Sequence, residues 1–338
     1  MADIRTEKQA IRDAVRDVAR AVHSDAVVEH LKSWPPLQGR AVTYLAMGDE
    51  IDLSGLSTLK RCELLATRID EDNALAIHRL VPDGLARHPY GFDEPSVTSP
   101  VVAFNDVDVV LVPGRAFDLS GNRLGRGAGY YDNLLSRLPR GVILVGITVD
   151  ATIVEKIPTA PHDQRVDWLA TESGVRRVGP KLPESSERFV DAAVSMGIAA
   201  APIRFPEGTK TSQDAANAIG CDLGAIAKSL VFLADDEPVL VICAGDRRVD
   251  EGKLAATIGA ATARPAPLSQ VRAISGYAGG GTPALGHRSP MPVVLDESLG
   301  RYRWVWSAAG TPETVYPVSL ERLIGATQAR IASITTED

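Results

Sequence analysis

The chain carries the stretch Val112-Pro113-Gly114-Arg115-Ala116-Phe117-Asp118, followed by Gly121-Asn122-Arg123-Leu124-Gly125-Arg126-Gly127-Ala128-Gly129-Tyr130-Tyr131-Asp132. This stretch lies where an apolar run typical of a strand ends and a helical pattern begins. Its glycines leave backbone N–H groups unobstructed, and the helix N-terminus and two arginines add positive potential, so the loop suits a triphosphate. Such glycines also often serve only to allow a tight turn, so the loop alone leaves both interpretations open.

The segments around this loop alternate between β-rich runs and helical patterns. Residues 4–23 place apolar side chains at three- and four-residue steps, which predicts an opening helix. The patterns that follow predict strands and helices in turn, with strands at 41–46, 107–112 and 142–149 and helices at 56–66 and 130–138. Near-continuous apolar strands separated by helices indicate a mostly parallel sheet covered on both faces, which is an α/β domain.

A boundary is predicted where breakers and polar residues concentrate, at Gly179-Pro180-Lys181-Leu182-Pro183-Glu184-Ser185-Ser186. We expect one domain at 1–180, a linker at 181–186 and a second domain at 187–338. The second half is predicted to be α+β because its strands are partly adjacent and partly separated by helices. Its expected elements are helices at 187–197, 212–220, 250–258 and 319–328, strands at 198–205, 229–234, 238–244, 292–296 and 302–306, and Gly-rich turns at 276–286.

Composition limits the classes of function. The 338 residues are 45% hydrophobic and 23% charged, which is ordinary for a globular protein with two cores. The net charge of -7 is shared by both halves, since residues 184–338 hold 14 basic and 18 acidic residues, so we expect no general DNA binding. No apolar run is long enough to span a membrane, and the three scattered cysteines fit a reducing cytoplasm.

The loop and several strings that accompany it resemble the signature of 5-formyltetrahydrofolate cyclo-ligases, also called methenyltetrahydrofolate synthetases. The matching strings occur in the family's order over residues 6–178: Lys8-Gln9-Ala10-Ile11-Arg12, Leu45-Ala46-Met47-Gly48-Asp49-Glu50-Ile51, Gly91-Phe92-Asp93-Glu94-Pro95 and His162-Asp163-Gln164-Arg165-Val166-Asp167. The resemblance implies a three-layer α/β fold similar to sugar-phosphate isomerases and CoA transferases. It also implies conversion of 5-formyltetrahydrofolate to 5,10-methenyltetrahydrofolate with ATP and Mg²⁺.

The resemblance also assigns residues to this site. Those implied to bind ATP are Lys8, Arg12, Arg123, Leu124, Gly125, Arg126, Gly127, Ala128, Gly129, Tyr130 and Tyr131. Asp132 and Asp163 match the metal positions, and carboxylates beside phosphate oxygens are what Mg²⁺ prefers. Leu45, Glu50 and Glu94 match the folate positions. An apolar slot for the pterin ring is expected from Leu45, Met47, Phe117, Tyr130, Tyr131 and Trp168.

The second half resembles the YbaK/ProX family of aminoacyl-tRNA deacylases. The strings that carry this resemblance include Ile226-Ala227-Lys228-Ser229-Leu230-Val231-Phe232 and Gly276-Tyr277-Ala278-Gly279-Gly280-Gly281-Thr282-Pro283. In that family the lysine is the key catalytic residue, which is Lys228 here. We expect it at a helix end, with free amides around Gly280 stabilising an oxyanion as water attacks the ester. The implied partner is the acceptor end of an aminoacyl-tRNA.

Other interpretations remain open at this point. Lys8 and Arg12 could form a solvated helix face, and Asp132 could merely stabilise a helix N-terminus. The second half could bind an aminoacyl ester without hydrolysing it, since the sequence contains no evident Ser-His-Asp set. The α/β fold could instead serve another reaction, such as sugar-phosphate isomerisation, but this would leave the cations of the first half without a nucleotide to bind.

Overall fold

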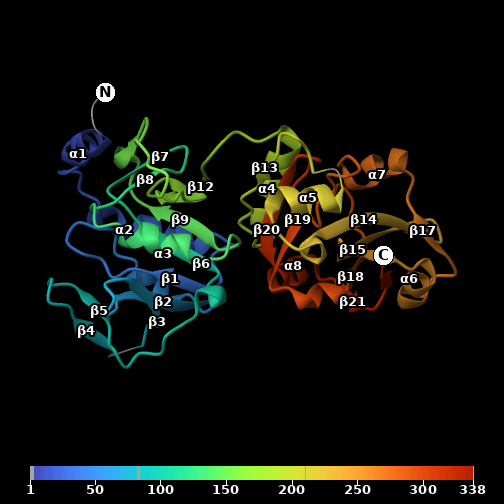
Figure 1. Ribbon diagram of the computed structural model, residues 1–338, viewed down its shortest axis with the longest axis horizontal. Coiled ribbons are helices and arrows are strands. Elements are labelled where there is room, and N and C mark those ends of the chain that lie inside the picture. The colour runs from blue at the N-terminus through green and yellow to red at the C-terminus, as the bar shows by residue number, and fades with distance from the viewer. Residues whose placement is uncertain (1–3, 82–83, 210, 338) are drawn as a thin grey trace. The chain divides into compact units, whose positions relative to one another are not determined.

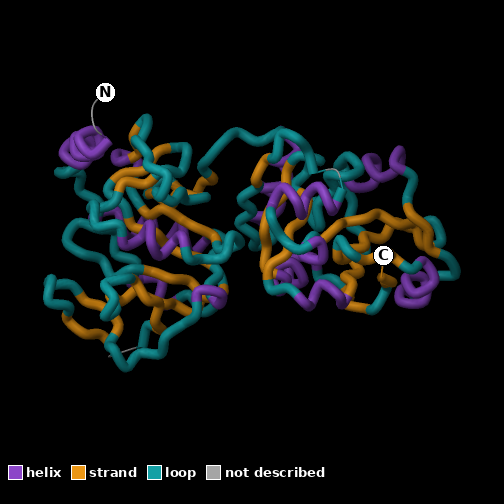
Figure 2. Tube along the Cα trace, in the orientation of Figure 1, coloured by secondary structure: helices purple, strands orange, loops and turns teal. Residues whose placement is uncertain are grey.

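The computed structural model describes residues 4–81, 84–209 and 211–337. The chain divides into two compact units, Met1–Pro180 and Lys181–Asp338, which are called unit 1 and unit 2 below. Each unit contains both helices and strands (Figures 1 and 2). Among the described residues, no helix is both long enough and apolar enough to cross a membrane.

Unit 1 is built on a seven-stranded sheet in the order β12-β11-β9-β6-β1-β2-β3. The five central strands are parallel to one another, and β12 and β3 join the two edges antiparallel. The strands are β1 (Gly39–Thr43), β2 (Cys62–Ile69), β3 (Leu75–Arg79), β6 (Val109–Pro113), β9 (Ile143–Ile147), β11 (Trp168–Thr171) and β12 (Gly174–Arg177).

The central strands of this sheet are covered on both faces. Consecutive residues of β6 and β11 are buried, although neighbouring side chains of a strand point to opposite faces. Helix α2 (Ser24–Ser33) packs against β11 and β12, and α3 (Tyr130–Ser136) packs against β3. The predicted three-layer α/β class with a mostly parallel sheet is therefore confirmed.

Smaller elements surround the main sheet. Helix α1 (Ile4–Ala14) opens the chain, and four 3₁₀ turns lie at Ala21–His23, Ser54–Thr58, Phe104–Asp106 and Asp150–Thr152. A second, three-stranded sheet joins β10 (Ile153–Val154), β7 (Ala116–Asp118) and β8 (Arg123–Leu124). A hairpin of β4 (Leu85–Arg87) and β5 (Asp93–Pro95) stands beside β2, as Figure 1 labels.

Two elements of unit 1 differ from the sequence-based predictions. The opening helix ends at Ala14 instead of continuing to residue 23, because the guanidinium of Arg20 takes the carbonyls of Val15 and Val18 that a longer helix would use. The helix predicted at 56–66 is wrong. That segment ends a 3₁₀ turn and enters β2, whose buried Leu65 and Ala66 fill the sheet beside β1.

Unit 2 contains a five-stranded sheet in the order β17-β14-β15-β18-β21 and a three-stranded sheet in the order β13-β20-β19. A bridge between Ile226 and Trp306 connects the two sheets at β14 and β19. The helices are α4 (Glu184–Ser195), α5 (Ser212–Ile219), α6 (Glu251–Ile258), α7 (Leu268–Ser275) and α8 (Leu320–Thr327). The strands are β13 (Ile203–Arg204), β14 (Ala227–Ala234), β15 (Glu237–Ala244), β16 (Arg247–Val249), β17 (Ala263–Pro265), β18 (Val293–Asp296), β19 (Trp304–Ala308), β20 (Thr314–Ser319), β21 (Arg330–Ala332) and β22 (Thr335–Glu337).

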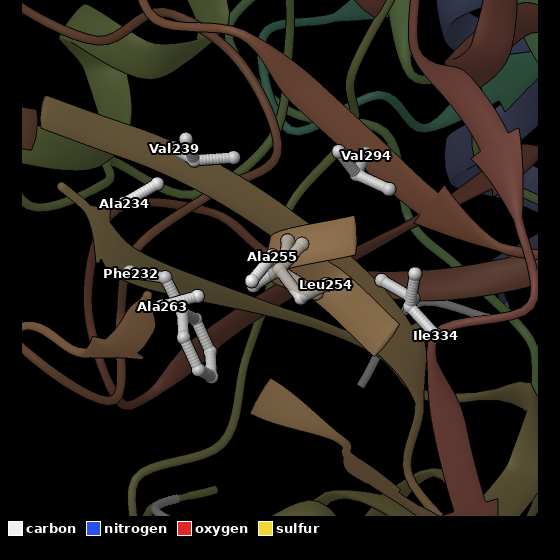
Figure 3. Packing of buried hydrophobic residues seen from close by; sticks show 9 residues of the cluster. Phe232, Ala234, Val239, Leu254, Ala255, Ala263, Val294 and Ile334 are labelled. Atoms are coloured by element: carbon white, nitrogen blue, oxygen red, sulfur yellow. The ribbon is translucent and has the colours of Figure 1, made fainter. Parts of the chain in front are cut away.

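One core of unit 2 forms where α6 covers the five-stranded sheet. Leu254 and Ala255 of α6 pack onto Phe232 of β14 and Val239 of β15, with Ile334 completing the cluster (Figure 3). Fully burying an aliphatic or aromatic side chain of this kind contributes about 1.5 to 3 kcal/mol relative to leaving it exposed. This helix-on-sheet core confirms the predicted α+β class.

The main departures in unit 2 concern strands. Residues 198–205 form only the two-residue strand β13. No strand is predicted at β20, although β20 pairs with both β13 and β19. Helix α4 begins at Glu184, three residues earlier than expected, and α7 was not expected. The predicted helix end at Lys228 is wrong, because this lysine lies in β14 opposite Cys243 of β15.

Candidate functional site

The candidate site of unit 1 lies where parallel strands end. Strand β1 ends at Thr43 and leads into the turn of residues 44–50, and the neighbouring β6 ends at Pro113 and leads into Gly114 and Arg115. In open α/β sheets, ligands bind in the crevice outside the carboxyl ends of the strands. The resemblance-carrying strings 45–51 and 112–118 thus meet at one edge of the sheet.

Lys8 and Asp163 form an ion pair across this edge. Lys8 Nζ lies 2.6 Å from Asp163 Oδ2, and the two side chains are only 15% and 13% exposed. Burial favours the neutral form of Asp163, but the hydrogen bonds from Lys8 and from the Ala160 N–H outweigh this effect and lower the pKa of the carboxyl. Asp163 is therefore held as a carboxylate beside a cation.

Arg123 and Asp132 form a second pair close by. The Arg123 guanidinium lies 2.8 Å from Asp132 Oδ2, and its side chain is 6% exposed. The other carboxylate oxygen of Asp132 accepts a hydrogen bond from the backbone N–H of Gln164 at 3.3 Å, which is the residue after Asp163. The turn at 163–164 therefore brings the two predicted metal ligands to the same part of the site.

The segment from Arg123 to Tyr131, called the glycine loop below, connects these pairs to α1. Arg12 Nε donates to the carbonyl of Gly125 at 3.0 Å, so α1 and the loop are joined directly. A Cβ at Gly125 would lie 2.7 Å from the Arg123 guanidinium, which explains a glycine there. Gly127 and Gly129 have φ angles of 108° and 76°, which side chains rarely adopt. Ala128 between them is exposed, whereas Leu124 is buried in a core cluster with Ala116.

A pocket of about 650 Å³ opens next to the loop. One wall is the turn that includes Leu45, Met47, Asp49 and Glu50, and another is the β4–β5 hairpin with Leu85, Arg87, Tyr90, Phe92 and Asp93. Arg126 of the glycine loop also lines it and lies 2.9 Å from Glu50 Oε1. The structure thus brings together the predicted residues Leu45, Glu50 and Arg126.

Three other predicted contributors lie elsewhere. Glu94 is 2% exposed, pairs with Arg68 at 2.7 Å and accepts from the Ile69 N–H, so its carboxylate ties β5 to β2 and does not line the described pocket. Phe117 is fully buried, and a Cβ at Gly114 or Gly146 would meet its ring within 2.6 Å. Trp168 packs on Trp34 in the core with ring centroids 5.3 Å apart. The prediction that Phe117 and Trp168 line a pterin slot is therefore wrong.

The two tyrosines at the start of α3 differ from each other. Tyr130 donates from its hydroxyl to Asn73 Oδ1 at 2.7 Å and is partly exposed. Tyr131 points inward beside Arg123, whose guanidinium carbon lies 5.7 Å from the ring centroid. Burial raises the pKa of Tyr131, so its phenol stays neutral.

Sequence reasoning missed a second charged cluster beneath the pocket. Asp49 accepts hydrogen bonds from Arg20 at 2.6 Å and from Arg115 at 2.8 Å. Arg20 is 2% exposed and also donates to the carbonyls of Val15 and Arg115. Arg20 therefore links three segments: the end of α1, the turn that carries Glu50, and Arg115, which lies just before β7. The signal available in the sequence was only that Asp49 and Arg115 fall inside the matching strings.

The residues around the glycine loop fit a magnesium ion bound with phosphates. No group of three or more histidine, cysteine or acidic side chains that could hold a metal occurs among the described residues. Asp132 and Asp163 nevertheless supply two carboxylates at one turn, and Mg²⁺ is usually bound by one or two carboxylates together with substrate phosphates. Lys8 and Arg123, which neutralise these carboxylates here, have the charge that phosphate oxygens require.

The candidate site of unit 2 is a smaller pocket of about 280 Å³. Lys228 and Gly280 both line it, so the structure brings the two predicted residues together. The remaining wall is mainly small, apolar or hydroxyl-bearing, with Thr209, Thr211, Ser212, Ala215, Ile226, Ala227, Ser229, Leu230, Thr282, Trp306, Ser307, Ala308 and Val315. Such a lining suits a small, uncharged group.

Lys228 is anchored at the edge of this pocket. Its ammonium donates to the carbonyl of Gly245 at 3.4 Å and to the carbonyl of Arg247. Gly245 lies close to the turn before β14, since a Cβ there would be 2.3 Å from the carbonyl oxygen of Leu223. The ammonium of Lys228 is thus held by the backbone that follows β15, at a point where Gly245 packs closely against Leu223.

The glycine-rich segment of unit 2, residues 276–283, packs against the turn that follows β19. Gly310 donates its N–H to the carbonyl of Gly281 at 3.1 Å, and a Cβ at Gly281 would lie 2.5 Å from the Thr311 backbone. Gly280 has a φ angle of 82°, a conformation that glycine adopts without strain. The close approach requires glycine at 281, and the backbone at 280 is presented to the pocket.

These features define a two-unit protein, in which an α/β unit carries a charged strand-end site and an α+β unit carries a small neutral pocket with a lysine. Residues 1–172 match the model of the 5-formyltetrahydrofolate cyclo-ligase family, and residues 206–326 match that of the aminoacyl-tRNA editing domain. The first match covers more than half of the chain. The chain therefore belongs to the 5-formyltetrahydrofolate cyclo-ligase family and carries an aminoacyl-tRNA editing domain, and both resemblances seen in the sequence are confirmed.

Individual relatives match one unit each. The 5-formyltetrahydrofolate cyclo-ligase of Saccharomyces cerevisiae is 31% identical in an alignment of 186 residues that covers 51% of this chain and 87% of the relative. The EbsC protein of Enterococcus faecalis, whose name describes a Cys-tRNA(Pro)/Cys-tRNA(Cys) deacylase, is 26% identical over 40% of this chain and 82% of its own length. A solved structure of Aquifex aeolicus 5,10-methenyltetrahydrofolate synthetase has 33% identity and a TM-score of 0.46 over 54% of this chain and 96% of that one.

Some matches are much shorter. The mitochondrial 5-formyltetrahydrofolate cyclo-ligase of Arabidopsis thaliana is 39% identical over 89 residues, and the match spans only 32% of that relative.

Proposed function

We propose that unit 1 catalyses the ATP- and Mg²⁺-dependent conversion of 5-formyltetrahydrofolate to 5,10-methenyltetrahydrofolate. The observation that carries this proposal is the set of three cation–carboxylate pairs around one glycine loop: Lys8 with Asp163, Arg123 with Asp132 and Arg126 with Glu50. A triphosphate needs cations and free amides, and its magnesium needs carboxylates, so both kinds of ligand are present around one loop.

The proposed reaction proceeds in two steps. The formyl oxygen attacks the γ-phosphorus of ATP, and ADP leaves. N10 then attacks the activated formyl carbon, the bond from that carbon to the phosphate oxygen breaks, and the N10 proton leaves with phosphate. The products are 5,10-methenyltetrahydrofolate, ADP and inorganic phosphate.

Different residues of unit 1 would bind the phosphates and the magnesium ion. Lys8, Arg12 and Arg123 would hold the phosphates together with the amides of the glycine loop, since phosphoryl transfer is catalysed mainly by positioning and charge neutralisation. Asp132 and Asp163 would hold Mg²⁺, which neutralises charge on the phosphates when bound. Because Asp163 has a lowered pKa, it would remain an anion for this purpose at neutral pH.

The 650 Å³ pocket would hold the folate. Leu45 and Met47 would contact the pterin ring, and Glu50 would accept hydrogen bonds from ring N–H groups. The β4–β5 hairpin would supply the opposite wall, where the aromatic rings of His88 and Phe92 stack with centroids 4.5 Å apart. Glu94 is assigned to holding this hairpin and not to the substrate.

An absorbance assay tests the proposal for unit 1. The full chain with 5-formyltetrahydrofolate, ATP and Mg²⁺ is expected to produce the absorbance of 5,10-methenyltetrahydrofolate together with one phosphate per product. Omission of ATP or addition of EDTA should abolish both signals. Formation of the product at an unchanged rate without ATP would contradict the proposal.

For unit 2 we propose hydrolysis of mischarged aminoacyl-tRNA esters. Water would add to the ester carbonyl, and collapse of the tetrahedral intermediate would break the bond between the carbonyl carbon and the ribose oxygen. The products would be the free amino acid and the tRNA, whose ribose oxygen takes up a proton of the water and becomes a hydroxyl. The Lys228 ammonium and backbone amides near Gly280 would stabilise the oxyanion, because both line the same small pocket. The proposal also places the protein in the cytoplasm, because Cys62, Cys221 and Cys243 lie scattered along the sequence, as is usual for a reducing compartment.

A second candidate role for unit 2 is binding of an aminoacyl ester without hydrolysis. It is favoured by the contacts of Lys228, whose ammonium is already engaged by two backbone carbonyls. A panel of mischarged tRNAs distinguishes the two roles. Catalysis predicts a loss of about 100-fold in deacylation for Lys228→Ala, the size seen when an oxyanion-stabilising group is removed. The matched control is Lys253→Ala, whose exposed ammonium contacts only the Thr335 carbonyl among the bonds described. Equal turnover in wild type and Lys228→Ala would leave only the binding role.

A further inference from the structure

One side chain connects the glycine loop to the folate pocket. Arg126 belongs to the loop proposed to hold phosphates, yet its guanidinium donates to Glu50 Oε1 from both Nε, at 3.1 Å, and the terminal nitrogen, at 2.9 Å. It also donates to the carbonyl of Met47 at 3.2 Å. This arginine therefore occupies the carboxylate that the pterin ring would use.

The two partners differ in how freely they can move. Glu50 is 14% exposed and its second oxygen accepts from the Met47 N–H at 3.0 Å, so the carboxylate is part of the turn. Arg126 is 45% exposed and lies in a loop between glycines. A rearrangement of this pair would therefore move the arginine and leave the glutamate in place.

The turn itself is held independently of Arg126. Asp49, the neighbour of Glu50, is bonded to Arg20 and Arg115, and Arg20 is almost fully buried. Removing Arg126 from Glu50 leaves these bonds intact. The pocket wall is thus expected to keep its shape while the hydrogen-bonding capacity of Glu50 changes.

We propose that Arg126 exchanges between Glu50 in the free enzyme and the triphosphate in the nucleotide-bound enzyme, so that ATP binding releases Glu50 to the folate. This inference rests on the proposed function of unit 1. A guanidinium binds phosphate and carboxylate oxygens by the same pair of N–H groups, so it can serve one partner or the other. Each substrate then favours the arrangement that the other requires, and the two bind cooperatively.

Linkage makes the coupling reciprocal. If nucleotide tightens folate binding by a given factor, folate must tighten nucleotide binding by the same factor. The Arg126–Glu50 pair is partly exposed, and solvent weakens such pairs. We therefore expect a coupling of about 5- to 10-fold, at the lower end of the range usual for two linked sites.

Titration of the full chain with 5-formyltetrahydrofolate tests the exchange, with and without a saturating non-hydrolysable ATP analogue and Mg²⁺. Wild type should bind the folate about 5- to 10-fold more tightly when the analogue is present. Arg126→Gln should bind folate more tightly than wild type without nucleotide, and its affinity should no longer depend on the analogue. Arg126→Lys, which keeps the charge, should retain part of the coupling.

Arg176→Gln is the matched control. Arg176 is 49% exposed and pairs with Asp150, away from the pocket lining, so this variant should keep the wild-type coupling. Independent binding of folate and analogue to wild type would overturn the exchange while leaving the proposed reaction intact. The same holds if Arg126→Gln, without nucleotide, binds folate no more tightly than wild type. Failure of wild type to bind folate at all would overturn the proposed function and the exchange together.

Discussion

The two candidate sites of this chain differ in the number of charged groups that they contain. In unit 1, Lys8, Arg123 and Arg126 each lie against a carboxylate, so the site holds many charges with little net charge. In unit 2, the lining is mostly small or hydroxyl-bearing, and Lys228 rests on backbone carbonyls. A site for a metal–triphosphate must supply ligands of both signs, whereas a site for an ester needs only to stabilise one oxyanion.

The difference indicates how each site can be disrupted. Removing one charge in unit 1 leaves its partner unbalanced in a partly buried position, so binding and packing should both suffer. Removing the lysine of unit 2 takes one donor from the carbonyls of Gly245 and Arg247, which are uncharged. Changes in one unit should therefore leave the activity of the other unit unaffected.

Lys8→Met is expected to have the largest effect on unit 1 while leaving unit 2 unchanged. This change removes a cation that is proposed to bind phosphate and leaves Asp163 without its 2.6 Å partner. We expect kcat/KM for ATP in methenyltetrahydrofolate formation to fall by about 100-fold or more, as when a preorganised charge is lost at a transition state. Deacylation by the same preparation should not change. Lys32→Met, which removes an exposed helix pair with Glu29, is the control, and a similar loss in that variant would contradict the assignment.

Stability can also be lowered in one unit alone. A Cβ at Gly146 would lie 2.6 Å from the Phe117 ring and 2.7 Å from Leu169. Gly146→Ala should therefore destabilise unit 1 by about 2 kcal/mol, which is typical of overpacking a core. Hydrogen exchange of peptides from both units measures this, and protection should drop only in unit 1. Gly300→Ala, where nothing lies within 4 Å of the added methyl, should have little effect, and equal losses in both variants would refute the packing argument.

The free energy of unfolding should depend on pH differently in the two units. Burial raises the pKa of Asp167 in unit 1 to about 6, although the Leu144 N–H donates to this carboxyl. Because the folded-state pKa lies above the unfolded value, the contribution is fully present below about pH 4 and is lost as the pH rises through about 6. Compared with wild type, Asp167→Asn should remove roughly 3 kcal/mol of this pH dependence from the unfolding free energy of unit 1, at about 1.4 kcal/mol per pKa unit.

The opposite sign is expected for Asp246 in unit 2. Its hydrogen bond from Arg301 is the largest cause of its lowered pKa, so its contribution is present above the unfolded pKa and is lost on acidification. Denaturant titrations from about pH 2 to about pH 8 measure both effects, because the Asp246 contribution is lost only below the unfolded pKa of an aspartate, about 3.9. An Asp167→Asn curve parallel to that of wild type would show that the carboxyl does not titrate as described.

The sequence predicted well what depends on local patterns. The valine-rich run at 107–112 predicted β6, and the pattern from residue 121 to Asp132 predicted a glycine-rich loop that leads into a helix, where α3 begins at Tyr130. It failed where distant contacts decide the outcome. Residues 56–66 have a helical pattern but enter β2 because Leu65 and Ala66 are required beside β1. Arg20 gave no local signal, since its role depends on Asp49 and on the Arg115 carbonyl far along the chain.

Apolar side chains illustrate the same limit within the site. Phe117 belongs to the most specific string, yet its ring fills the space left by Gly114 and Gly146 and cannot line a slot. Lys228 was expected at a helix end and lies on a strand, although the predicted pairing with Gly280 in one pocket stays consistent with the structure. Residue type thus indicated chemistry, whereas the direction of each side chain required the tertiary fold.

The most direct test of the account measures both reactions on one preparation of each of three proteins: wild type, Asp132→Ala and Lys228→Ala. We predict that wild type forms 5,10-methenyltetrahydrofolate with ATP and Mg²⁺ and deacylates at least one mischarged tRNA. Asp132→Ala should lose the first activity and keep the second, and Lys228→Ala should show the reverse. Full methenyltetrahydrofolate formation by folded Asp132→Ala, or loss of both activities in either variant, would contradict two separate sites with separate chemistries.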